Sequence, residues 1–233
     1  MYDKRKDFNM QRYLIENHGP NEANVKFMFC ESVRICQRDG MSKITLCVPS
    51  KREFPTTIVG RMLGDTAKKL CQGRAVPLLG NLLFDLVCAN KIQSSCTYEM
   101  IIGVYLSLDA IYNLDSIQSV KAIMFLPWTE NEGKMWLTTW NATILGANTW
   151  QVHQTSLPLD VDNTLSVLTH GINLPTGLTH PFDRDAARRV LIELRDSGHV
   201  LCPSNVRNWA MQKGWSYDAA KDLASEVVKI FHR

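Results

Sequence analysis

The sequence lacks an apolar run that could cross a membrane. Its longest apolar stretches, Met100–Leu108 and Val120–Trp128, are far shorter than the ~20 residues that a membrane-spanning helix needs. Basic residues occur within residues 1–12, but no apolar run follows them, so we expect no secretory signal peptide. These absences predict a soluble protein of the cytoplasm that has no membrane partner.

Cysteine occurs in no pattern that indicates disulfide bonds or bound metal. The seven cysteines are an odd number with scattered spacing, and no CxxC pair occurs. Most of them lie within apolar stretches, where a free cysteine behaves as a small buried hydrophobic residue. We therefore predict reduced thiols, which agrees with a cytoplasmic location.

The signature motifs of several large enzyme classes are also missing. The sequence contains no GxxxxGK[ST] loop, no GxGxxG fingerprint, no GxSxG nucleophile turn and no HExxH zinc motif. His153, His170 and His180 are too far apart in sequence for a typical zinc site, and we predict no bound metal. No sequence feature identifies a cofactor.

The composition is that of an ordinary globular chain whose charge is unevenly distributed. Of the 233 residues, 45% are hydrophobic and 21% are charged, which excludes a disordered chain. Residues 1–75 carry a net charge of +6, residues 76–180 carry −5 and residues 181–233 carry +2. Nucleic-acid binding through the basic N-terminal third stays open, although +6 is mild for that function. It requires these basic side chains to share one face: Lys4, Arg5, Lys6, Arg12, Lys51, Arg52, Lys68 and Lys69.

Hydrophobic periodicity predicts strands that alternate with helices in the first two thirds of the chain. Short β-rich runs bounded by turn residues predict strands at 43–48, 75–79, 99–106 and 120–126. Apolar residues at spacings of three and four predict helices at 21–39, 56–72 and 132–145, and Ser107 is expected to cap another. The apolar run 82–89 fits either a strand or a helix.

Strands that are apolar along their whole length predict a parallel sheet covered on both faces. We predict an α/β fold: a three-layer, Rossmann-like, mostly parallel sheet of four to five strands with a C-terminal three-helix module. The expected parts are a flexible N-terminal arm (1–20), the α/β core (21–148), an irregular connecting segment (149–181) and the helical module (182–233). Within the connecting segment we expect only a short helix, near Thr164–Leu168.

One stretch of the sequence resembles a known supersecondary unit. The run VKAIMFLPW, followed by EGKMWLTTWNATILG, resembles the strand-to-helix unit of Rossmann-like proteins. The resemblance implies an architecture and no activity, because that fold serves many functions.

Two loops are candidate ligand-binding sites because of their position in the expected fold: ligands of parallel α/β sheets bind at the carboxyl ends of the strands. After the strand at 43–48, free N–H groups could hold a phosphate or carboxylate together with the side chains of Ser50, Lys51, Arg52, Thr56 and Thr57. An ordinary capped helix with solvated charges explains the same residues.

The second loop follows the strand at 120–126, and Asp109 follows the strand at 99–106. The loop contributes Trp128, Thr129 and Glu130, and the helix after it carries Trp136. A carboxylate beside an aromatic wall could recognise a base, a sugar or a cation. Carboxylates in a first helical turn also favour the helix dipole, however, and tryptophans on one helical face are more often core residues.

The C-terminal helices carry two tryptophans that could anchor an interface. Trp209 and Trp215 are large rings of the kind that dominate interface energetics, so we predict packing against the core, a second copy of the chain or a protein partner. DNA reading by the last helix is disfavoured, because Asp218 and Asp222 would face the phosphates.

The missing motifs favour a non-catalytic binding or regulatory protein over an enzyme. We predict that the α/β core holds a small anionic or nucleotide-like ligand or docks a protein partner. The first alternative is an enzyme in which Lys51 or Arg52 meets Glu130 or Asp109 in one concave pocket at the strand ends. The second alternative is nucleic-acid binding through the N-terminal third.

Overall fold

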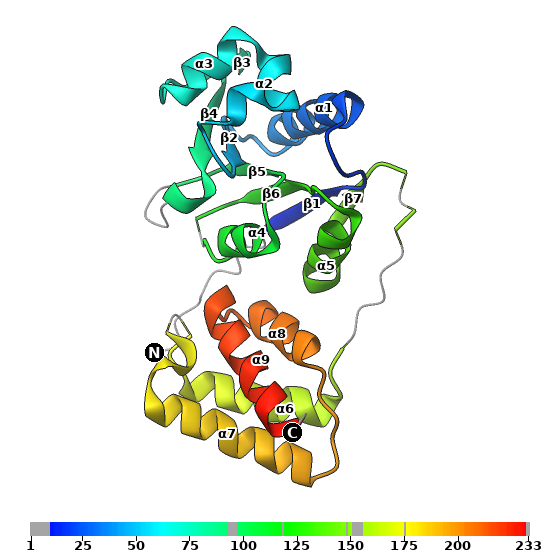
Figure 1. Ribbon diagram of the computed structural model, residues 1–233, viewed down its shortest axis with the longest axis vertical. Coiled ribbons are helices and arrows are strands. Elements are labelled where there is room, and N and C mark those ends of the chain that lie inside the picture. The colour runs from blue at the N-terminus through cyan, green and yellow to red at the C-terminus, as the bar shows by residue number, and fades with distance from the viewer. Residues whose placement is uncertain are drawn as a thin grey trace. The chain divides into compact units, whose positions relative to one another are not determined.

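The computed structural model describes residues 10–92, 97–117, 119–147, 149–150, 156–174 and 176–231. The chain divides into two compact units, which we call the α/β unit and the helical unit (Figure 1). The α/β unit comprises Met1–Leu137 and Asn141–Gln151, and the helical unit comprises Thr138–Trp140 and Val152–Arg233. Within the described ranges, no helix combines the length and the hydropathy that crossing a membrane requires.

One mostly parallel sheet forms the centre of the α/β unit. In the described part of the chain it has seven strands in the order β3-β4-β2-β5-β6-β1-β7, of which only the β3–β4 pair is antiparallel. Every residue of β5 and β6 is buried, which is why both strands are apolar from end to end. The α/β class with a mostly parallel sheet is therefore confirmed. The strands are β1 (Gln11–Ile15), β2 (Lys43–Val48), β3 (Val76–Leu79), β4 (Leu82–Cys88), β5 (Met100–Val104), β6 (Ala122–Leu126) and β7 (Thr143–Leu145).

The predicted count of four to five strands was wrong: β1 and β7 were not predicted, and the run that forms β4 fitted either a strand or a helix. β1 lies between β6 and β7, inside the residues 1–20 that were expected to form a flexible arm. β7 occupies the end of the predicted helix 132–145, because Asn141 takes the left-handed conformation (φ 50°) and ends the helix at Trp140. The ambiguous run 82–89 forms β4.

Helices cover both faces of the sheet. On one face lie α1 (Glu22–Arg38), α2 (Ile58–Leu63) and α3 (Asp65–Cys71), and on the other lie α4 (Leu108–Asp115) and α5 (Glu130–Trp140) (Figure 1). The single helix predicted at 56–72 is split in two, since Gly64 leaves the helical conformation (φ 53°). Ser107 caps α4 as predicted, by accepting a hydrogen bond from the N–H of Ala110. Two short 3-10 turns, η1 (Phe54–Thr56) and η2 (Ala89–Lys91), follow β2 and β4.

The direction of the connections reverses between β2 and β5. The chain leaves β2 toward α2 and α3 on one face and toward β4, whereas it leaves β5 toward α4 on the other face and toward β6. Loops that diverge in this way leave room between them at the carboxyl ends of the two strands, and ligands of open α/β sheets bind at such points. The topology therefore predicts a ligand site at the carboxyl ends of β2 and β5.

A buried carboxylate ties together the face covered by α4 and α5. Asp115, at the end of α4, accepts hydrogen bonds from Arg12 Nε of β1 and from Trp136 Nε1 of α5, each at 2.7 Å. The Trp136 ring is fully buried and packs edge-on against Phe125, with the ring centroids 5.6 Å apart. One side chain therefore connects three elements that are far apart in the sequence.

The helical unit contains one more helix than the predicted three-helix module. In its described residues the helices are α6 (Leu159–Gly171), α7 (Pro181–Asp196), α8 (Pro203–Gln212) and α9 (Tyr217–Phe231), with the 3-10 turn η3 (Gly177–Thr179). α6 runs through the segment that was expected to be irregular and is longer than the short helix expected there. Its buried side is narrow, consisting of Val161, Leu165 and Leu168, and so gives a weak periodic signal.

The two C-terminal tryptophans hold α6 in place inside the helical unit. Trp209 and Trp215 are only 6% and 3% exposed. The indole N–H of Trp209 donates to Asp162, and that of Trp215 donates to Thr169 Oγ1 at 3.1 Å. Both rings are therefore buried within the helical unit, and their role as anchors of an interface with a partner or a second copy stays a prediction.

Candidate functional site

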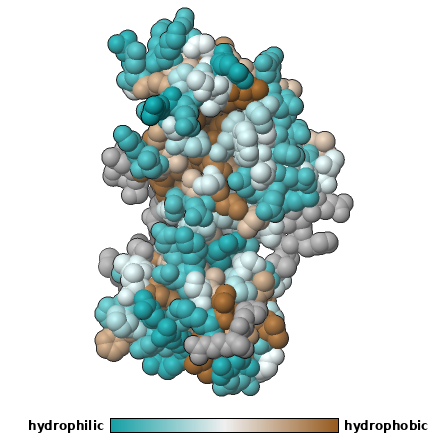
Figure 2. Space-filling view, in the orientation of Figure 1, coloured by the Kyte–Doolittle hydropathy of each residue, from teal (hydrophilic) through white to brown (hydrophobic). Residues whose placement is uncertain are grey.

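Three neighbouring strands end side by side at the place that the topology selects. β2, β5 and β6 end at Val48, Val104 and Leu126. Pro49, Tyr105 and Trp128 come within two residues of these ends and line a common space. Figure 2 shows hydrophobic residues in the middle of the visible face of the α/β unit, between hydrophilic residues on either side.

Tyr105 has an unusual backbone conformation at the end of β5. Its φ of 53° lies in the left-handed region, which is uncommon for a bulky non-glycine residue and costs about 1–3 kcal/mol. The conformation is held because the Tyr105 N–H donates to the Leu126 carbonyl at 2.9 Å and the phenol O–H donates to the Gly19 carbonyl at 3.0 Å. Burial raises the pKa of the phenol above its ordinary value, so Tyr105 is uncharged at neutral pH.

Tyr105 and Trp128 form one aromatic wall. Their rings lie edge to face, with centroids 5.2 Å apart and an interplanar angle of 87°. Trp128 is 50% exposed, so one side of its ring remains open to solvent or to a ligand.

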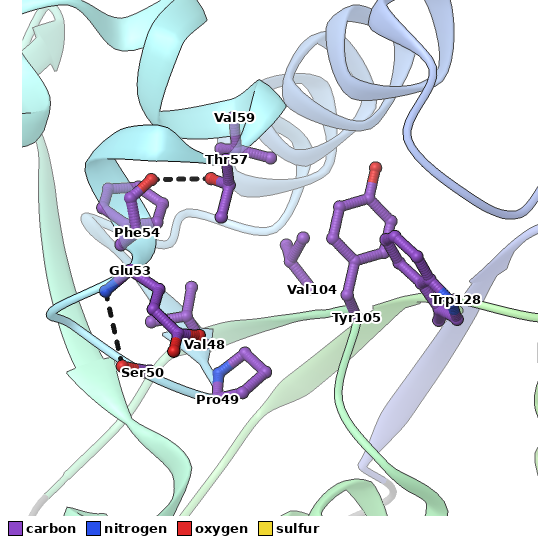
Figure 3. Close-up of a pocket in the computed structure, with 10 residues that line it drawn as sticks. All are labelled: Val48, Pro49, Ser50, Glu53, Phe54, Thr57, Val59, Val104, Tyr105 and Trp128. Atoms are coloured by element: carbon purple, nitrogen blue, oxygen red, sulfur yellow. Dashed lines mark hydrogen bonds between the residues drawn. The ribbon is translucent and has the colours of Figure 1, made fainter.

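The first space beside this wall is a mostly apolar hollow of about 220 Å³, which we call the apolar cavity. In Figure 3, Phe54 and Thr57 lie across it from Tyr105 and Trp128, with Val48 and Val104 between them. The Thr57 hydroxyl donates to the Phe54 carbonyl at 2.7 Å and accepts the Gly60 N–H at 3.1 Å, which fixes the start of α2. The residues that line the apolar cavity are Val48, Pro49, Ser50, Glu53, Phe54, Thr57, Val59, Val104, Tyr105 and Trp128.

A second space on the same aromatic wall, the acidic cavity, has a volume of about 610 Å³. It shares Pro49, Tyr105 and Trp128 with the apolar cavity, so the two spaces adjoin. Its charged lining residues are Asp109 and Glu132, from the first turns of α4 and α5. Glu132 also accepts the Thr129 N–H at 2.9 Å in a capping box, so this carboxylate stabilises α5 as well.

Only part of the predicted ligand-binding set lines these cavities. Ser50, Thr57 and Trp128 line the apolar cavity, and Asp109 and Trp128 line the acidic cavity. The others have different environments. Arg52 and Thr56 are exposed, and the backbone of Lys51 is hydrogen-bonded to the thiols of two cysteines. Thr129 caps α5, and Glu130 forms an ion pair with Lys134 at 2.6 Å. Trp136 is a core residue.

Sequence reasoning missed Tyr105 and Glu53. Tyr105 was assigned to the strand 99–106, but β5 ends one residue before it, and a strand assignment hides a loop residue. The rule that ligands bind where strands end could have found Tyr105 with a strand boundary one residue earlier. Glu53 lies inside the nominated loop, between Arg52 and Phe54, and was passed over in favour of the cations.

In the described part of the chain, neither of these two cavities contains a charged pair of the kind that the enzyme hypothesis requires. Asp109 lines the acidic cavity, but neither cavity includes Lys51, Arg52 or Glu130 among its described lining residues. The Lys134 ammonium lowers the pKa of Glu130, as expected for an exposed ion pair rather than a general acid. In the described ranges, no three His, Cys, Asp or Glu side chains are grouped so that they could hold a metal ion.

The basic residues of the N-terminal third are partly engaged within the protein. Arg12 pairs with the buried Asp115, and Lys68 pairs with Asp65 at 2.9 Å. Lys4, Arg5 and Lys6 lie outside the described residues, as does His153. The guanidinium of Arg12 is therefore engaged by a buried carboxylate and contributes less to the proposed basic surface.

Outside these cavities, Cys202 is the described cysteine with an acidified thiol. It is exposed at the start of α8, where a hydrogen bond with Ser204, at 3.1 Å, lowers its pKa. We expect iodoacetamide at pH 7.5 to alkylate Cys202 at least about tenfold faster than Cys47, because burial raises the pKa of Cys47 to about 12. Peptide mass spectrometry over time measures both rates. Ser204→Ala should slow only Cys202, and an unchanged rate in that variant contradicts the role of the hydrogen bond.

The structure thus defines an α/β unit with two adjoining cavities at the carboxyl edge of its sheet, and a separate helical unit. Residues 160–233, which make up most of the helical unit, match a family described as a domain of unknown function (DUF1889). No curated protein and no solved structure matches the chain.

Proposed function

We propose that the α/β unit is a Rossmann-like, three-layer module that binds a small molecule without transforming it. The ligand occupies the apolar cavity between the ends of β2 and β5, against Tyr105 and Trp128. The observation that carries this proposal is the strained Tyr105 backbone, since strain of this kind concentrates at functional sites. The position of the cavity, at a reversal of the connections, supports the same conclusion.

The size of the apolar cavity favours a flat group of one or two rings. An apolar cavity of about 150 Å³ accommodates benzene, and this one measures about 220 Å³. The open side of Trp128 and the opposing Phe54 offer stacking and edge contacts to such a ring.

The charge of the lining favours an uncharged or cationic ligand. Among the described lining residues of both cavities the charged ones are Glu53, Asp109 and Glu132, and none is Lys or Arg. A nucleoside fits this description better than a nucleotide, because a phosphate group in either cavity would face carboxylates. The anionic ligand expected from Lys51 and Arg52 therefore has less support than a neutral, nucleoside-like one.

The proposal predicts which small molecules stabilise the protein. In a thermal-shift comparison, adenosine and indole should raise the melting temperature, and adenosine monophosphate should bind no more tightly than adenosine. Trp128→Ala should weaken adenosine binding about tenfold, the equivalent of roughly 1.4 kcal/mol for a lost aromatic contact. Isothermal titration calorimetry measures the affinities.

Phe182→Ala is the matched control, since Phe182 is an aromatic residue of the helical unit that is 78% exposed. It should leave adenosine binding unchanged. Failure of adenosine and indole to bind, or equal binding by the Trp128→Ala variant, contradicts the proposed site.

The other predicted functions have less support in the structure than the binding of a small molecule. Enzymatic activity and nucleic-acid binding have no specific observation in their favour, and a partner-binding role for Trp209 and Trp215 would require buried rings to become exposed. A reducing compartment such as the cytoplasm is supported by the free thiols of the six described cysteines.

A further inference from the structure

Two cysteine thiols meet at the backbone of the loop that forms one wall of the apolar cavity. Lys51 donates its N–H to Cys88 Sγ at 3.2 Å, and its carbonyl accepts a hydrogen bond from Cys71 Sγ at 3.5 Å. Cys88 ends β4 and Cys71 ends α3, so two separate elements converge on the backbone of one residue. Residues on either side of Lys51, namely Pro49, Ser50 and Glu53, line the apolar cavity.

The strand register shows which thiols share a face of the sheet. Cys88 is paired with Val48 and continues the buried face of β4 that carries Phe84 and Leu86. Phe84 and Leu86 belong to the core beneath α2 and α3, against which Cys71 also packs. Cys47 precedes Val48 in β2, so its side chain points to the opposite face.

We propose that Cys71 and Cys88 form a redox-sensitive pair whose oxidation to a disulfide reshapes the wall of the apolar cavity. The formation of the disulfide stands on its own, whereas its effect on a ligand rests on the function proposed above. The bond would be made by exchange with a small disulfide such as oxidised glutathione.

The exchange proceeds in two steps that conserve atoms and electrons. The Cys71 thiolate attacks one sulfur of oxidised glutathione, which forms a mixed disulfide and releases one glutathione thiolate. The Cys88 thiolate then attacks Cys71 Sγ, which forms the intramolecular bond and releases the second glutathione. Two protein thiols are oxidised, one glutathione disulfide is reduced to two thiols, and the protein's two thiol protons end on the released glutathione. Cys71 reacts first, because it is half-buried whereas Cys88 is buried.

The bond has a direct consequence for the loop. Oxidation removes the thiol hydrogen of Cys71, so Cys71 can no longer donate to the Lys51 carbonyl. The two sulfurs must also approach to about 2.05 Å, which draws Cys88 Sγ away from the Lys51 N–H. The backbone at Lys51 has to move, and it carries Ser50 and Glu53 with it. Oxidation therefore changes the wall opposite Tyr105 and Trp128 and should weaken binding there.

The first experiment detects the bond without any ligand. The full-length protein is incubated with oxidised glutathione at pH 8, its remaining thiols are blocked, and its peptides are analysed by mass spectrometry. We expect a peptide pair linked through Cys71 and Cys88, which Cys71→Ser, Cys71→Ala and Cys88→Ser each abolish. The exposed Cys30 provides the matched control, and Cys30→Ser should leave the linked pair unchanged. A Cys47–Cys88 link, mixed disulfides alone, or linkage only after denaturation overturns the proposal.

The second experiment measures the loop and the cavity. Hydrogen exchange of the Lys51 amide should become at least about tenfold faster on oxidation, since the amide loses its bond to Cys88, and should not change in oxidised Cys71→Ser. Adenosine is the probe of the cavity, and its affinity should fall severalfold on oxidation and recover with dithiothreitol. An unchanged Lys51 amide in the linked protein refutes the switch. If adenosine does not bind the reduced protein, the proposed function fails. The linked peptide and the exchange rate of the Lys51 amide still test whether Cys71 and Cys88 form a disulfide that moves the loop.

Discussion

Replacing Asp115 with alanine should lower the free energy of unfolding of the α/β unit by about 3–5 kcal/mol, the usual cost of removing one partner of a buried ion pair. The substitution leaves the Arg12 guanidinium and the Trp136 indole N–H without the carboxylate that accepts from both at 2.7 Å. The Asp115 side chain is 1% exposed and that of Arg12 is 18% exposed, so water compensates only in part. Urea unfolding at pH 7, followed by circular dichroism, measures the loss.

Glu130→Gln is the control for this prediction. Glu130 also pairs with a cation, Lys134, but both side chains are more than 40% exposed. Water screens an exposed pair of this kind, so its loss should scarcely change the urea midpoint. If Asp115→Ala costs no more than Glu130→Gln, the buried carboxylate does not hold the three elements together.

Replacing Gly177 with alanine should destabilise the helical unit by roughly 2–5 kcal/mol, because the strain of a left-handed alanine costs about 1–2 kcal/mol and overpacking about 1–3 kcal/mol. Gly177 has φ 54°, and a Cβ there would lie 2.3 Å from Ala219 Cβ and 2.9 Å from Ala219 Cα. The 3-10 turn η3 would have to move away from α9. Thermal unfolding followed by circular dichroism at 222 nm measures the effect.

Gly198→Ala separates the two contributions. Gly198 also has a positive φ, 86°, but a Cβ there meets no atom within 4 Å in the described structure. Its substitution should therefore cost only the conformational strain of a left-handed alanine, about 1–2 kcal/mol. Equal losses for the two variants would show that the close approach of η3 to α9 contributes nothing.

Periodicity predicted the elements that have a broad apolar face and missed those with a narrow one. The strands at 43–48 and 120–126 were predicted from their sequence because their side chains are almost all buried and apolar. β1 escaped because only its last three residues, Tyr13 to Ile15, are buried. α6 was predicted only as a short helix near Thr164–Leu168 for a related reason: its buried stripe consists of three residues, and the tryptophans that complete its packing come from α8 and the residues after it.

The place of the candidate site was more predictable than its chemistry. The rule about strand ends led to the loops that contain Ser50, Thr57 and Trp128, all of which line the apolar cavity. It could not separate Trp128 from Trp136, since both are tryptophans near the end of β6, yet one is half exposed and the other is fully buried. That difference depends on Asp115 and Phe125, which come from other elements and which no local pattern brings to Trp136.

The position of β1 in the sheet has a consequence for how the chain folds. β1 is an early segment of the chain, yet its neighbours β6 and β7 follow it by more than a hundred residues, as in the pairing of Gln11 with Ala122. Contacts between such distant segments form late and slowly, because a long loop must close before they stabilise anything. During synthesis, Gln11–Ile15 therefore cannot pair with both β6 and β7 until Leu145 has left the ribosome. A nascent chain stalled at residue 120 would expose the hydrophobic end of this strand, Tyr13 to Ile15, which makes it a natural target for chaperones.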